Sequence, residues 1–203
     1  MKIIKPSYTL FMPYDGEQII RNIEYYGRTC YKSAGGFGTA EKFVLDRIRD
    51  GHESVLEHEK LTVKFTCDRG VSHEIVRHRL ASYSQESTRY CNYADERFGE
   101  ELTFIRPCYW EKGTPEMEHW EKMMSEVERL YMALIHTGSQ PQQARCILPN
   151  SLKTELIMTA NMREWRHFLK LRTARDAHPQ MRELTVPLLK ELQEKVPIMF
   201  DDI

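Results

Sequence analysis

The sequence predicts an α+β fold, a single domain over residues 1–203 in which a small central β-sheet is flanked by long helices. Residues 116–137 repeat apolar side chains at the spacing of one helical face, as a long amphipathic helix does. Residues 60–67 instead alternate polar and apolar side chains, which is typical of a strand. Helical and strand patterns do not alternate regularly along the chain, and this favours α+β over a parallel α/β sheet. No internal repeat or linker-like segment divides the sequence.

The first part of the chain is expected to form two strands and three helices. Ile19, Ile20 and Ile23 lie on one face of the first expected helix, and the three glycines of residues 33–38 break it. Thr39 is a good cap for the next helix, because its hydroxyl can accept a backbone N–H. The elements expected here are a strand over 3–12, a helix over 16–32, a helix from Thr39 to Gly51, a strand over 60–67, a turn at 68–70 and a short helix over 71–79.

The second part begins with a polar segment and is then mostly helical. The apolar stripe of residues 116–137 is more typical of a core or a subunit interface than of a cofactor site. Pro187 lies inside the last expected helix and should kink or split it, because proline lacks the N–H that a helix interior needs. The elements expected here are a polar loop over 80–100, a strand over 102–105, a helix over 116–137, a short helix from Pro141 that carries Arg145, a strand over 151–159, a helix over 161–172 and a helix over 179–196.

Charge and cysteine content exclude several classes of protein. With 29 Lys and Arg against 30 Asp and Glu, the net charge is -1, unlike that of a general nucleic-acid binder, so no nucleic-acid partner is expected. No apolar run is long enough to cross a bilayer, and the first residues lack the pattern of a secretory signal. A cytoplasmic protein without a membrane partner is therefore expected. The five cysteines are widely spaced without a CxxC pair, which argues against a disulfide framework or a cysteine zinc site.

Several familiar catalytic patterns are missing from the sequence. His73 and His78 are five residues apart and would diverge by about 140° on a helix, whereas the histidines of a zinc-binding helix are four apart. His52 and His58 are six apart and fail similarly, so no metal is expected. The chain also lacks a GxSxG elbow, a GxGxxG loop and a P-loop. A bound nucleotide would therefore be held by arginines and hydroxyls.

The stretch from Arg77 to Tyr90, RHRLASYSQESTRY, combines three arginines and a histidine with several hydroxyl and amide side chains. Guanidinium groups match phosphate and carboxylate oxygens two at a time, so this composition indicates a site for a phosphorylated, polar ligand. A solvated basic loop explains the composition equally well. If residues 77–79 are helical, Arg77 and Arg79 project about 200° apart and address two sites or two subunits. A second basic set shares one helical face, which is either a ligand surface or solvated: Arg163, Arg166, His167 and Lys170.

These residues lead to a family resemblance. Arg77-His78-Arg79, followed after seven residues by Ser87, resembles the signature of the flavin-dependent thymidylate synthases. Further segments resemble blocks of the same family and occur in the same order, so the resemblance is specific and covers roughly residues 28–183. These segments are GHESVLEH at 51–58, ARCILP at 144–149, and NMR at 161–163 with FLKLR at 168–172.

The resemblance implies an activity and a set of ligands. It implies the family's fold and a homotetramer that binds FAD, dUMP, 5,10-methylenetetrahydrofolate and NADPH. Such an enzyme makes dTMP by reductive methylation of the uracil ring: folate supplies the carbon, and NADPH-reduced FAD supplies the reducing equivalents. The family needs no enzyme cysteine attached to the uracil, in keeping with the absence of a clear nucleophilic cysteine here.

The resemblance also assigns roles by position. Arg172 matches the arginine that contacts the pyrimidine and favours its ionisation at N3, because a fixed positive charge stabilises the developing anion. Ser87 is expected to donate a hydrogen bond to dUMP, and His52 matches a histidine near flavin and folate. Positions that match dUMP contacts are Glu74, Arg77, Gln85, Glu86, Ser87, Thr88, Arg89, Arg145 and Arg172. Positions that match FAD contacts are Ser54, Arg77, His78, Arg79, Gln85, Asn161, Arg163 and His167.

The sequence departs from the family pattern at three places. Gln85 stands where many relatives have a glutamate, and Glu74 stands where a glutamine is common. The spacing after Arg172 is longer than usual, so the roles of Arg175 and His178 stay open.

Two other functions remain as alternatives. A non-catalytic nucleotide- or RNA-binding protein would use the same arginines, with Tyr83, Tyr90 and Tyr93 for stacking, although the near-neutral charge weighs against it. A structural oligomerisation domain is suggested only by the stripe at 116–137. Binding of FAD would separate both from the enzyme.

Overall fold

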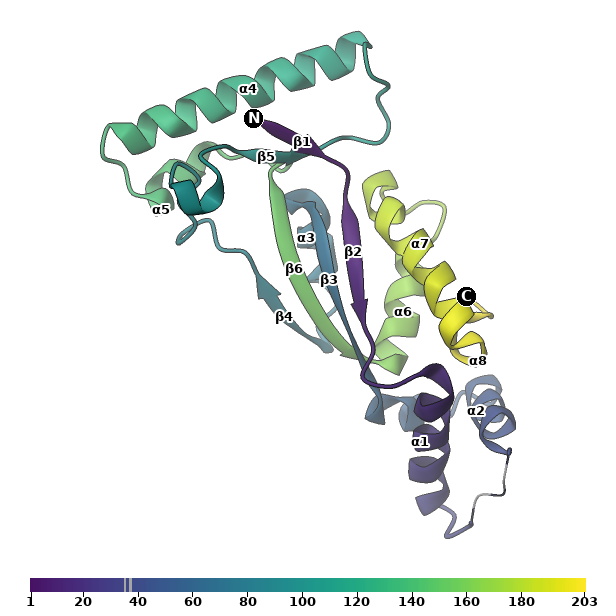
Figure 1. The fold of residues 1–203 in the computed structure, drawn as a ribbon. Helices are drawn as coiled ribbons and strands as arrows, with labels where there is room; N and C mark the ends of the chain where they lie inside the picture. Colours follow the sequence, from purple (N-terminus) through teal and green to yellow (C-terminus); the bar gives the residue numbers. More distant parts are fainter. Residues whose placement is uncertain (35, 37) are drawn as a thin grey trace. The chain divides into compact units, whose positions relative to one another are not determined.

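The computed structural model describes residues 1–34, 36 and 38–203. Helices and strands are mixed, which confirms the predicted α+β class (Figure 1). Gly35 and Phe37, in the segment expected to break the first helix, lie outside the described residues. The chain divides into two compact units, each assembled from three segments, and the single domain over residues 1–203 stays a prediction. Unit 1 comprises Met1–Ser7, Phe65–Arg77 and Ser84–Leu156, and unit 2 comprises Tyr8–Lys64, His78–Tyr83 and Ile157–Ile203.

Unit 1 contains a two-stranded parallel sheet beside one long helix. β1 (Lys2–Ile4) pairs with β5 (Thr103–Ile105), with Lys2 opposite Thr103. α4 (Pro115–His136) lies along this pair, as Figure 1 shows, and its Trp120 ring meets Phe104 edge-on with centroids 6.5 Å apart. The other elements that lie in this unit are α3 (Arg69–Ile75), the 3-10 turn η2 (Glu96–Phe98), α5 (Pro141–Ala144) and the 3-10 turn η3 (Arg145–Ile147).

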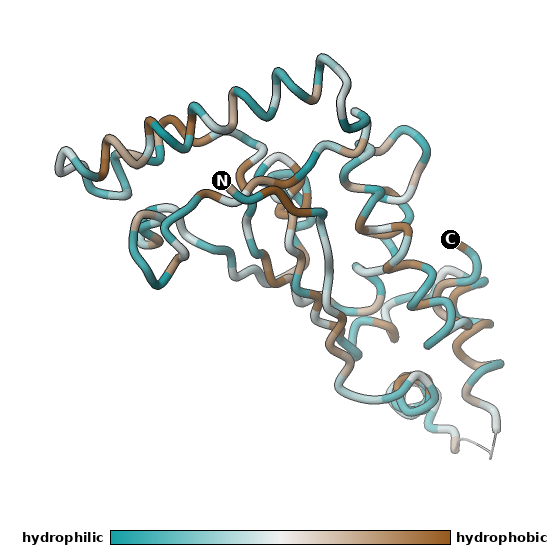
Figure 2. The backbone as a smooth tube through the Cα atoms, turned by 45° about the horizontal axis from the view of Figure 1, so that its top comes forward, coloured by the Kyte–Doolittle hydropathy of each residue, from teal (hydrophilic) through white to brown (hydrophobic). Residues whose placement is uncertain are grey.

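The predicted stripe of α4 forms part of the core of unit 1. Thr114 accepts the N–H of Met117 and Pro115 occupies the first turn, so the helix begins where proline and a hydroxyl cap favour it. In Figure 2, α4 alternates between hydrophilic and hydrophobic residues along its length. The stripe residues buried in the core are Met117, Trp120, Met124 and Tyr131.

Unit 2 is mostly helical. Its core includes the fully buried Trp165 and Phe168, whose rings meet edge-on with centroids 5.5 Å apart. The Trp165 indole N–H donates to the Leu61 carbonyl at 3.0 Å, so the buried ring keeps a polar partner. The helices of this unit are α1 (Gly16–Thr29), α2 (Ala40–Arg49), the 3-10 helix η1 (Glu53–His58), α6 (Met162–Arg172), α7 (Pro179–Lys195) and α8 (Pro197–Phe200).

A four-stranded sheet has the strand order β2-β3-β6-β4. β3 shows the alternating burial predicted for residues 60–67, and the predicted strand and helix after residue 150 are found as β6 and α6. The strands β3, β4 and β6 each begin in one unit and end in the other. The bounds are Ser7–Phe11 for β2, Lys60–Asp68 for β3, Ala81–Gln85 for β4 and Lys153–Asn161 for β6.

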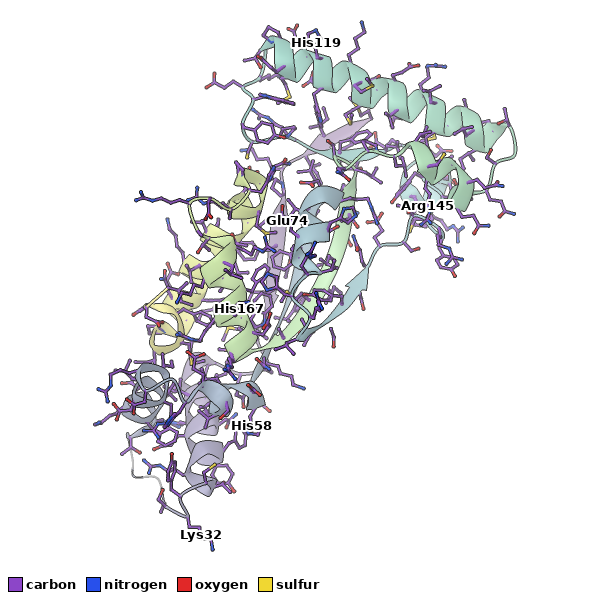
Figure 3. All side chains as sticks on the ribbon, turned by 180° about the vertical axis from the view of Figure 1, so that it is seen from behind. Lys32, His58, Glu74, His119, Arg145 and His167 are labelled. Atoms are coloured by element: carbon purple, nitrogen blue, oxygen red, sulfur yellow. The ribbon has the colours of Figure 1, made fainter. Side chains whose placement is uncertain are left out.

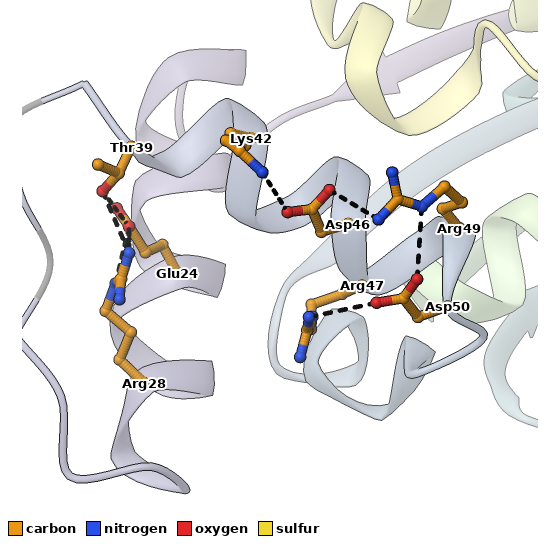
Figure 4. A network of polar contacts seen from close by, with 8 residues as sticks. All are labelled: Glu24, Arg28, Thr39, Lys42, Asp46, Arg47, Arg49 and Asp50. Carbon is orange, nitrogen blue, oxygen red and sulfur yellow. Dashed lines mark hydrogen bonds and ion pairs between the residues drawn. The ribbon is translucent and has the colours of Figure 1, made fainter.

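Polar contacts join α1 to the start of α2 (Figure 4). Glu24 is buried, and its carboxylate accepts hydrogen bonds from the Arg28 guanidinium, at 2.7 Å, and from the Thr39 hydroxyl. Thr39 does precede α2, but its hydroxyl makes no capping bond, so the predicted cap is wrong in its chemistry. The hydroxyl instead links the two helices.

The first predicted strand, over residues 3–12, is two strands. Lys5 and Pro6 separate β1 from β2, and proline cannot donate to a strand ladder. β1 pairs with β5, whereas β2 pairs with β3 in the other sheet. The apolar pattern of residues 3–12 therefore belongs to two strands in two different sheets.

The predictions for residues 68–79 are wrong in two places. Asp68 does not begin a turn: its carboxylate accepts the Val71 N–H at 2.8 Å and caps α3. The helix then ends at Ile75, so residues 77–79 are not helical. The predicted opposite projection of Arg77 and Arg79 on a helix therefore does not apply.

Two other expectations about local structure were wrong, and a third was wrong in one of its two alternatives. Residues 80–100 are not one polar loop, because β4 lies within them as an edge strand whose exposed residues are small and polar. α5 ends at Ala144, so Arg145 lies in η3. Pro187 was expected to kink or split α7; the helix is not split and continues to Lys195, and the kink stays a prediction. None of the helices in the described part of the chain combines the length and apolar character needed to cross a bilayer.

Candidate functional site

Helix α6 positions four of the predicted site residues of unit 2, namely Asn161, Arg163, His167 and Arg172. Asn161 caps it, with its side-chain oxygen accepting the Glu164 N–H at 2.8 Å. Glu164 and Phe168 are four residues apart and both buried, so Glu164 lies on the apolar face of the helix. Arg172 ends the helix, and the Thr185 hydroxyl of α7 donates to its carbonyl oxygen at 2.7 Å.

Arg172, His78 and Glu164 form a hydrogen-bonded chain. The Nε atom of Arg172 donates to Nε2 of His78 at 3.1 Å, and Nδ1 of His78 lies 3.2 Å from Oε1 of Glu164. A guanidinium can only donate, so Nε2 of His78 must accept. The ring proton then lies on Nδ1 and is donated to Glu164.

Burial and charge keep His78 neutral near pH 7. His78 is 5% exposed, and burial, followed by the charge of Arg172 and by His167, lowers its pKa from 6.5 to about 4. Burial also raises the pKa of Glu164 above that of an ordinary glutamate. A neutral imidazole is the form that can accept from Arg172.

A cavity of about 530 Å³ opens beside the three hydrogen-bonded side chains Arg172, His78 and Glu164. His167, labelled in Figure 3, lies on α6 with its ring centroid 5.6 Å from that of His78. The cavity wall mixes cations with acids, because Lys170 and Arg163 line it together with Glu53 and Glu57. The predicted flavin positions that line it are Asn161, Arg163 and His167.

A second cavity of unit 2, of about 330 Å³, contains two more predicted residues. His52 and Ser54 line it, and Arg163 lines both cavities. Arg163 is half exposed and donates to Glu57 at 2.7 Å. The structure thus brings five predicted positions of unit 2 around two cavities that share one arginine.

Two of the three residues of the Arg77-His78-Arg79 triplet are exposed. Arg79 in unit 2 and Arg77 in unit 1 are both accessible to solvent. His78, between them, is the buried member.

The predicted dUMP positions lie mainly in unit 1. Thr88 is buried, and Arg145, labelled in Figure 3, lies near it with Nη1 3.5 Å from the hydroxyl. Ser87 accepts the Arg89 N–H at 3.3 Å. Glu74 is half-buried on α3. The structure therefore brings Ser87, Thr88, Arg89 and Arg145 close together.

Gln85 and Glu86 are held by polar partners of unit 1. The Gln85 amide donates to the hydroxyls of Ser72, at 2.9 Å, and Thr154, at 3.2 Å. The Glu86 carboxylate accepts from Lys153 at 2.8 Å and from the Tyr93 hydroxyl at 2.7 Å. Their contacts with ligands stay predictions.

Three side chains of unit 2 could in principle hold a metal ion. One ligand atom from each of His78, Glu164 and His167 lies within 4.8 Å of the others. The Arg172 guanidinium, bonded to His78, places a positive charge at this point and disfavours a cation. Chain spacing could not identify the cluster, because His78 lies far from α6 in sequence.

Sequence reasoning missed Glu164 and Lys153. The available signal for Glu164 was its place on the apolar face of α6, between Trp165 and Asn161, where a carboxylate needs a partner. Lys153 gave no signal, because it pairs with Glu86 only through the strand pairing around β6.

A family model described as thymidylate synthase complementing protein matches residues 15–198. The chain belongs to this family. The matched range includes every residue to which we assign a site role, because these residues lie between His52 and Arg172. The family resemblance predicted from the sequence is thereby confirmed.

Proteins that are similar to this chain carry the name flavin-dependent thymidylate synthase. The protein of Pyrococcus furiosus is 40% identical over 156 residues, covering 76% of this chain and 63% of its own length. That of Geobacter sulfurreducens is 35% identical over 184 residues, covering 86% and 78%. That of Mycobacteroides abscessus is 32% identical over 194 residues, covering 89% and 78%. The chain thus spans less than two thirds of the Pyrococcus relative.

Proposed function

We propose that the chain is a flavin-dependent thymidylate synthase, which methylates dUMP reductively to dTMP. The carbon donor is 5,10-methylenetetrahydrofolate, and the reductant is FAD reduced by NADPH. The observation that carries the proposal is the family match over residues 15–198, supported by relatives with this name. Single-domain organisation, assembly into a homotetramer and a cytoplasmic location are part of the same proposal.

The residues of unit 2 fit a flavin cofactor. FAD carries a negatively charged diphosphate, and the cavities present Arg163, His167 and Lys170. Arg47 lines the smaller cavity, and its buried Nε has no hydrogen-bond partner among the described atoms. FAD would supply the reducing equivalents when bound. The residues proposed to hold it are Ser54, Arg77, His78, Arg79, Gln85, Asn161, Arg163 and His167, with His52 near flavin and folate.

The arginines carry the proposed chemistry toward dUMP. Arg172 keeps a permanent positive charge, so it stabilises negative charge at N3 of the uracil and makes the ring more reactive. Arg145 and Arg89 would bind the nucleotide phosphate through charge-assisted hydrogen bonds. Ser87 and Thr88 would orient it through their hydroxyls, and Glu74, Arg77, Gln85 and Glu86 complete the proposed nucleotide site.

The non-catalytic RNA-binding alternative is not favoured. It relied on Tyr83 and Tyr90, with Tyr93 just beyond them, for stacking, but Tyr93 is buried in the core of unit 1. The Tyr83 hydroxyl donates to the His78 carbonyl at 2.6 Å, and this ring is partly buried. Tyr90 is the exposed member of the three.

The direct test is an assay of the purified chain. With FAD, dUMP, 5,10-methylenetetrahydrofolate and NADPH we expect dTMP to form, and we expect none when dUMP, the folate or NADPH is withheld, or when the protein has been stripped of FAD. Expression in a thymidine-requiring host should permit growth without thymidine. Absence of both dTMP and flavin absorption, even after FAD is added, would refute the proposal.

Arg172→Ala tests the proposed catalytic arginine. We expect kcat to fall by at least about 100-fold, because one electrostatic stabiliser contributes roughly 3 kcal/mol. FAD should stay bound, as measured by flavin absorption after gel filtration. Arg129→Ala on the exposed face of α4 is the control and should keep normal turnover. Near-normal turnover of Arg172→Ala would remove this residue from the mechanism.

A further inference from the structure

The hydrogen bonds that run from Arg172 through His78 end at Glu164, a residue to which no role has been assigned. Glu164 is 7% exposed, and its carboxylate faces Nδ1 of His78 at 3.2 Å. Burying a carboxylate costs free energy unless it has a partner, so this placement calls for a purpose. His78 is the partner that the described contacts of this carboxylate provide.

An ionised carboxylate can accept hydrogen bonds but cannot donate them. Facing Nδ1, it favours the tautomer of His78 that carries the proton there. The other nitrogen, Nε2, then presents a lone pair to Arg172, whose Nε lies 3.1 Å away. If the proton moved to Nε2, two N–H groups would face each other and this bond would be lost.

The bond to Nε also fixes the plane of the guanidinium. Nε, Nη1 and Nη2 are coplanar, so one strong hydrogen bond at Nε limits how the other two nitrogens can point. Arg172 also has its backbone carbonyl held by Thr185. Orientation matters because a small misplacement of a catalytic charge lowers the rate strongly.

We propose that Glu164 is a positioning residue, which fixes the Nδ1–H tautomer of His78 and, through it, the orientation of the Arg172 guanidinium. Glu164 itself touches no reacting atom in this scheme. The kinetic part of this inference rests on the proposed function. The tautomer part does not, because it concerns only the three side chains of unit 2.

The test compares Glu164→Ala and Glu164→Gln with the wild type. ¹⁵N-histidine NMR reports which ring nitrogen carries the proton, and a His78→Gln variant identifies the His78 signals among the eight histidines. We expect the wild type to be protonated on Nδ1 and the alanine variant to shift toward Nε2–H. The glutamine variant should lie between them, because an amide can accept or donate.

The kinetic arm measures kcat and KM for dUMP in the same proteins. We expect Glu164→Ala to lower kcat on the order of 10- to 100-fold, with FAD affinity within about threefold of wild type. Glu126→Gln, an exposed carboxylate on α4, should change neither tautomer nor kcat. Circular dichroism checks that each variant is folded.

Two results would overturn the proposal. One is a wild-type His78 protonated on Nε2, and the other is a folded Glu164→Ala variant that retains the Nδ1–H tautomer and normal kcat. If no variant and no wild-type sample forms dTMP, the proposed function fails, and the NMR comparison still decides whether Glu164 sets the tautomer.

Discussion

The single residue His78 makes the folding stability of the protein depend on pH. It lies between a cation and a buried carboxylate, and it is neutral in the folded protein although an ordinary histidine would be partly charged near pH 6. Its burial therefore makes stability depend on proton binding. Glu164 acts in the opposite direction, because burial raises its pKa.

The His78 pKa predicts acid sensitivity. Between pH 6.5 and about 4 the unfolded chain binds a proton at His78 that the folded chain does not, so folding stability should fall as pH drops through this window. The loss amounts to about 3 kcal/mol for this group. Urea unfolding of the wild type at pH 7, 5.5 and 4.5 measures it.

The matched variant for this prediction is His78→Gln, which cannot titrate. Its free energy of unfolding should fall less than that of the wild type between pH 7 and 4.5, which separates His78 from carboxylates such as Glu164. Equal pH dependence in both proteins would show that His78 contributes nothing in this window.

Within helix α6, the residues of the basic face have two different roles, one structural and one at the cavity. Arg166 is buried, and its two Nη atoms donate to both oxygens of Asp202 at 2.7 Å. Nη2 also lies 3.6 Å from Glu53. All four residues line the larger cavity, but Arg163, His167 and Lys170 are exposed there. Helical spacing placed all four on one face, but only packing decides which of them is structural.

Arg166→Ala should destabilise the protein by about 2 kcal/mol, because it removes the hydrogen bonds to the half-exposed Asp202 and leaves a buried backbone carbonyl without its donor. Arg163→Ala, on the same helix, removes a half-exposed ion pair and should cost less than about 1 kcal/mol. Urea unfolding of both variants measures the difference. Equal costs would show that the buried arrangement adds no stability.

The predictable elements are those whose signal is local. β3 and α4 carry a clear period in their own sequence, and Asn161 and Pro115 mark helix starts by their own chemistry. β4 could not be predicted, because its polar residues form a strand only through pairing with β6. The same reason hides Glu164 and Lys153, whose partners are distant in sequence.

At the scale of the whole molecule, the proposed site residues are distributed over both units. His52, Ser54, His78 and those of α6 belong to unit 2, whereas the residues from Gln85 to Arg89 and Arg145 belong to unit 1. Within the stretch from Arg77 to Tyr90 the chain leaves unit 1 at His78 and returns to it at Ser84. Sequence adjacency therefore joins residues that belong to different compact units.

The interleaved chain predicts one cooperative unfolding transition, as expected for the single domain we propose. Each unit is built from three segments, and β3, β4 and β6 run from one unit into the other. Melting one unit would remove part of a strand that the other unit needs, so neither should unfold alone. The three tryptophans allow a direct test, because Trp110 and Trp120 belong to unit 1 and Trp165 to unit 2.

The double variant Trp110→Phe/Trp120→Phe keeps only Trp165, so its fluorescence reports on unit 2. The variant Trp165→Phe keeps Trp110 and Trp120, so its fluorescence reports on unit 1. In each variant, fluorescence and far-UV circular dichroism should give the same urea midpoint and the same slope. Core substitutions shift the midpoint of a whole variant, so the comparison is made between probes within one protein. Separate midpoints for fluorescence and circular dichroism in either variant would mean that the units unfold independently and that the chain is two domains.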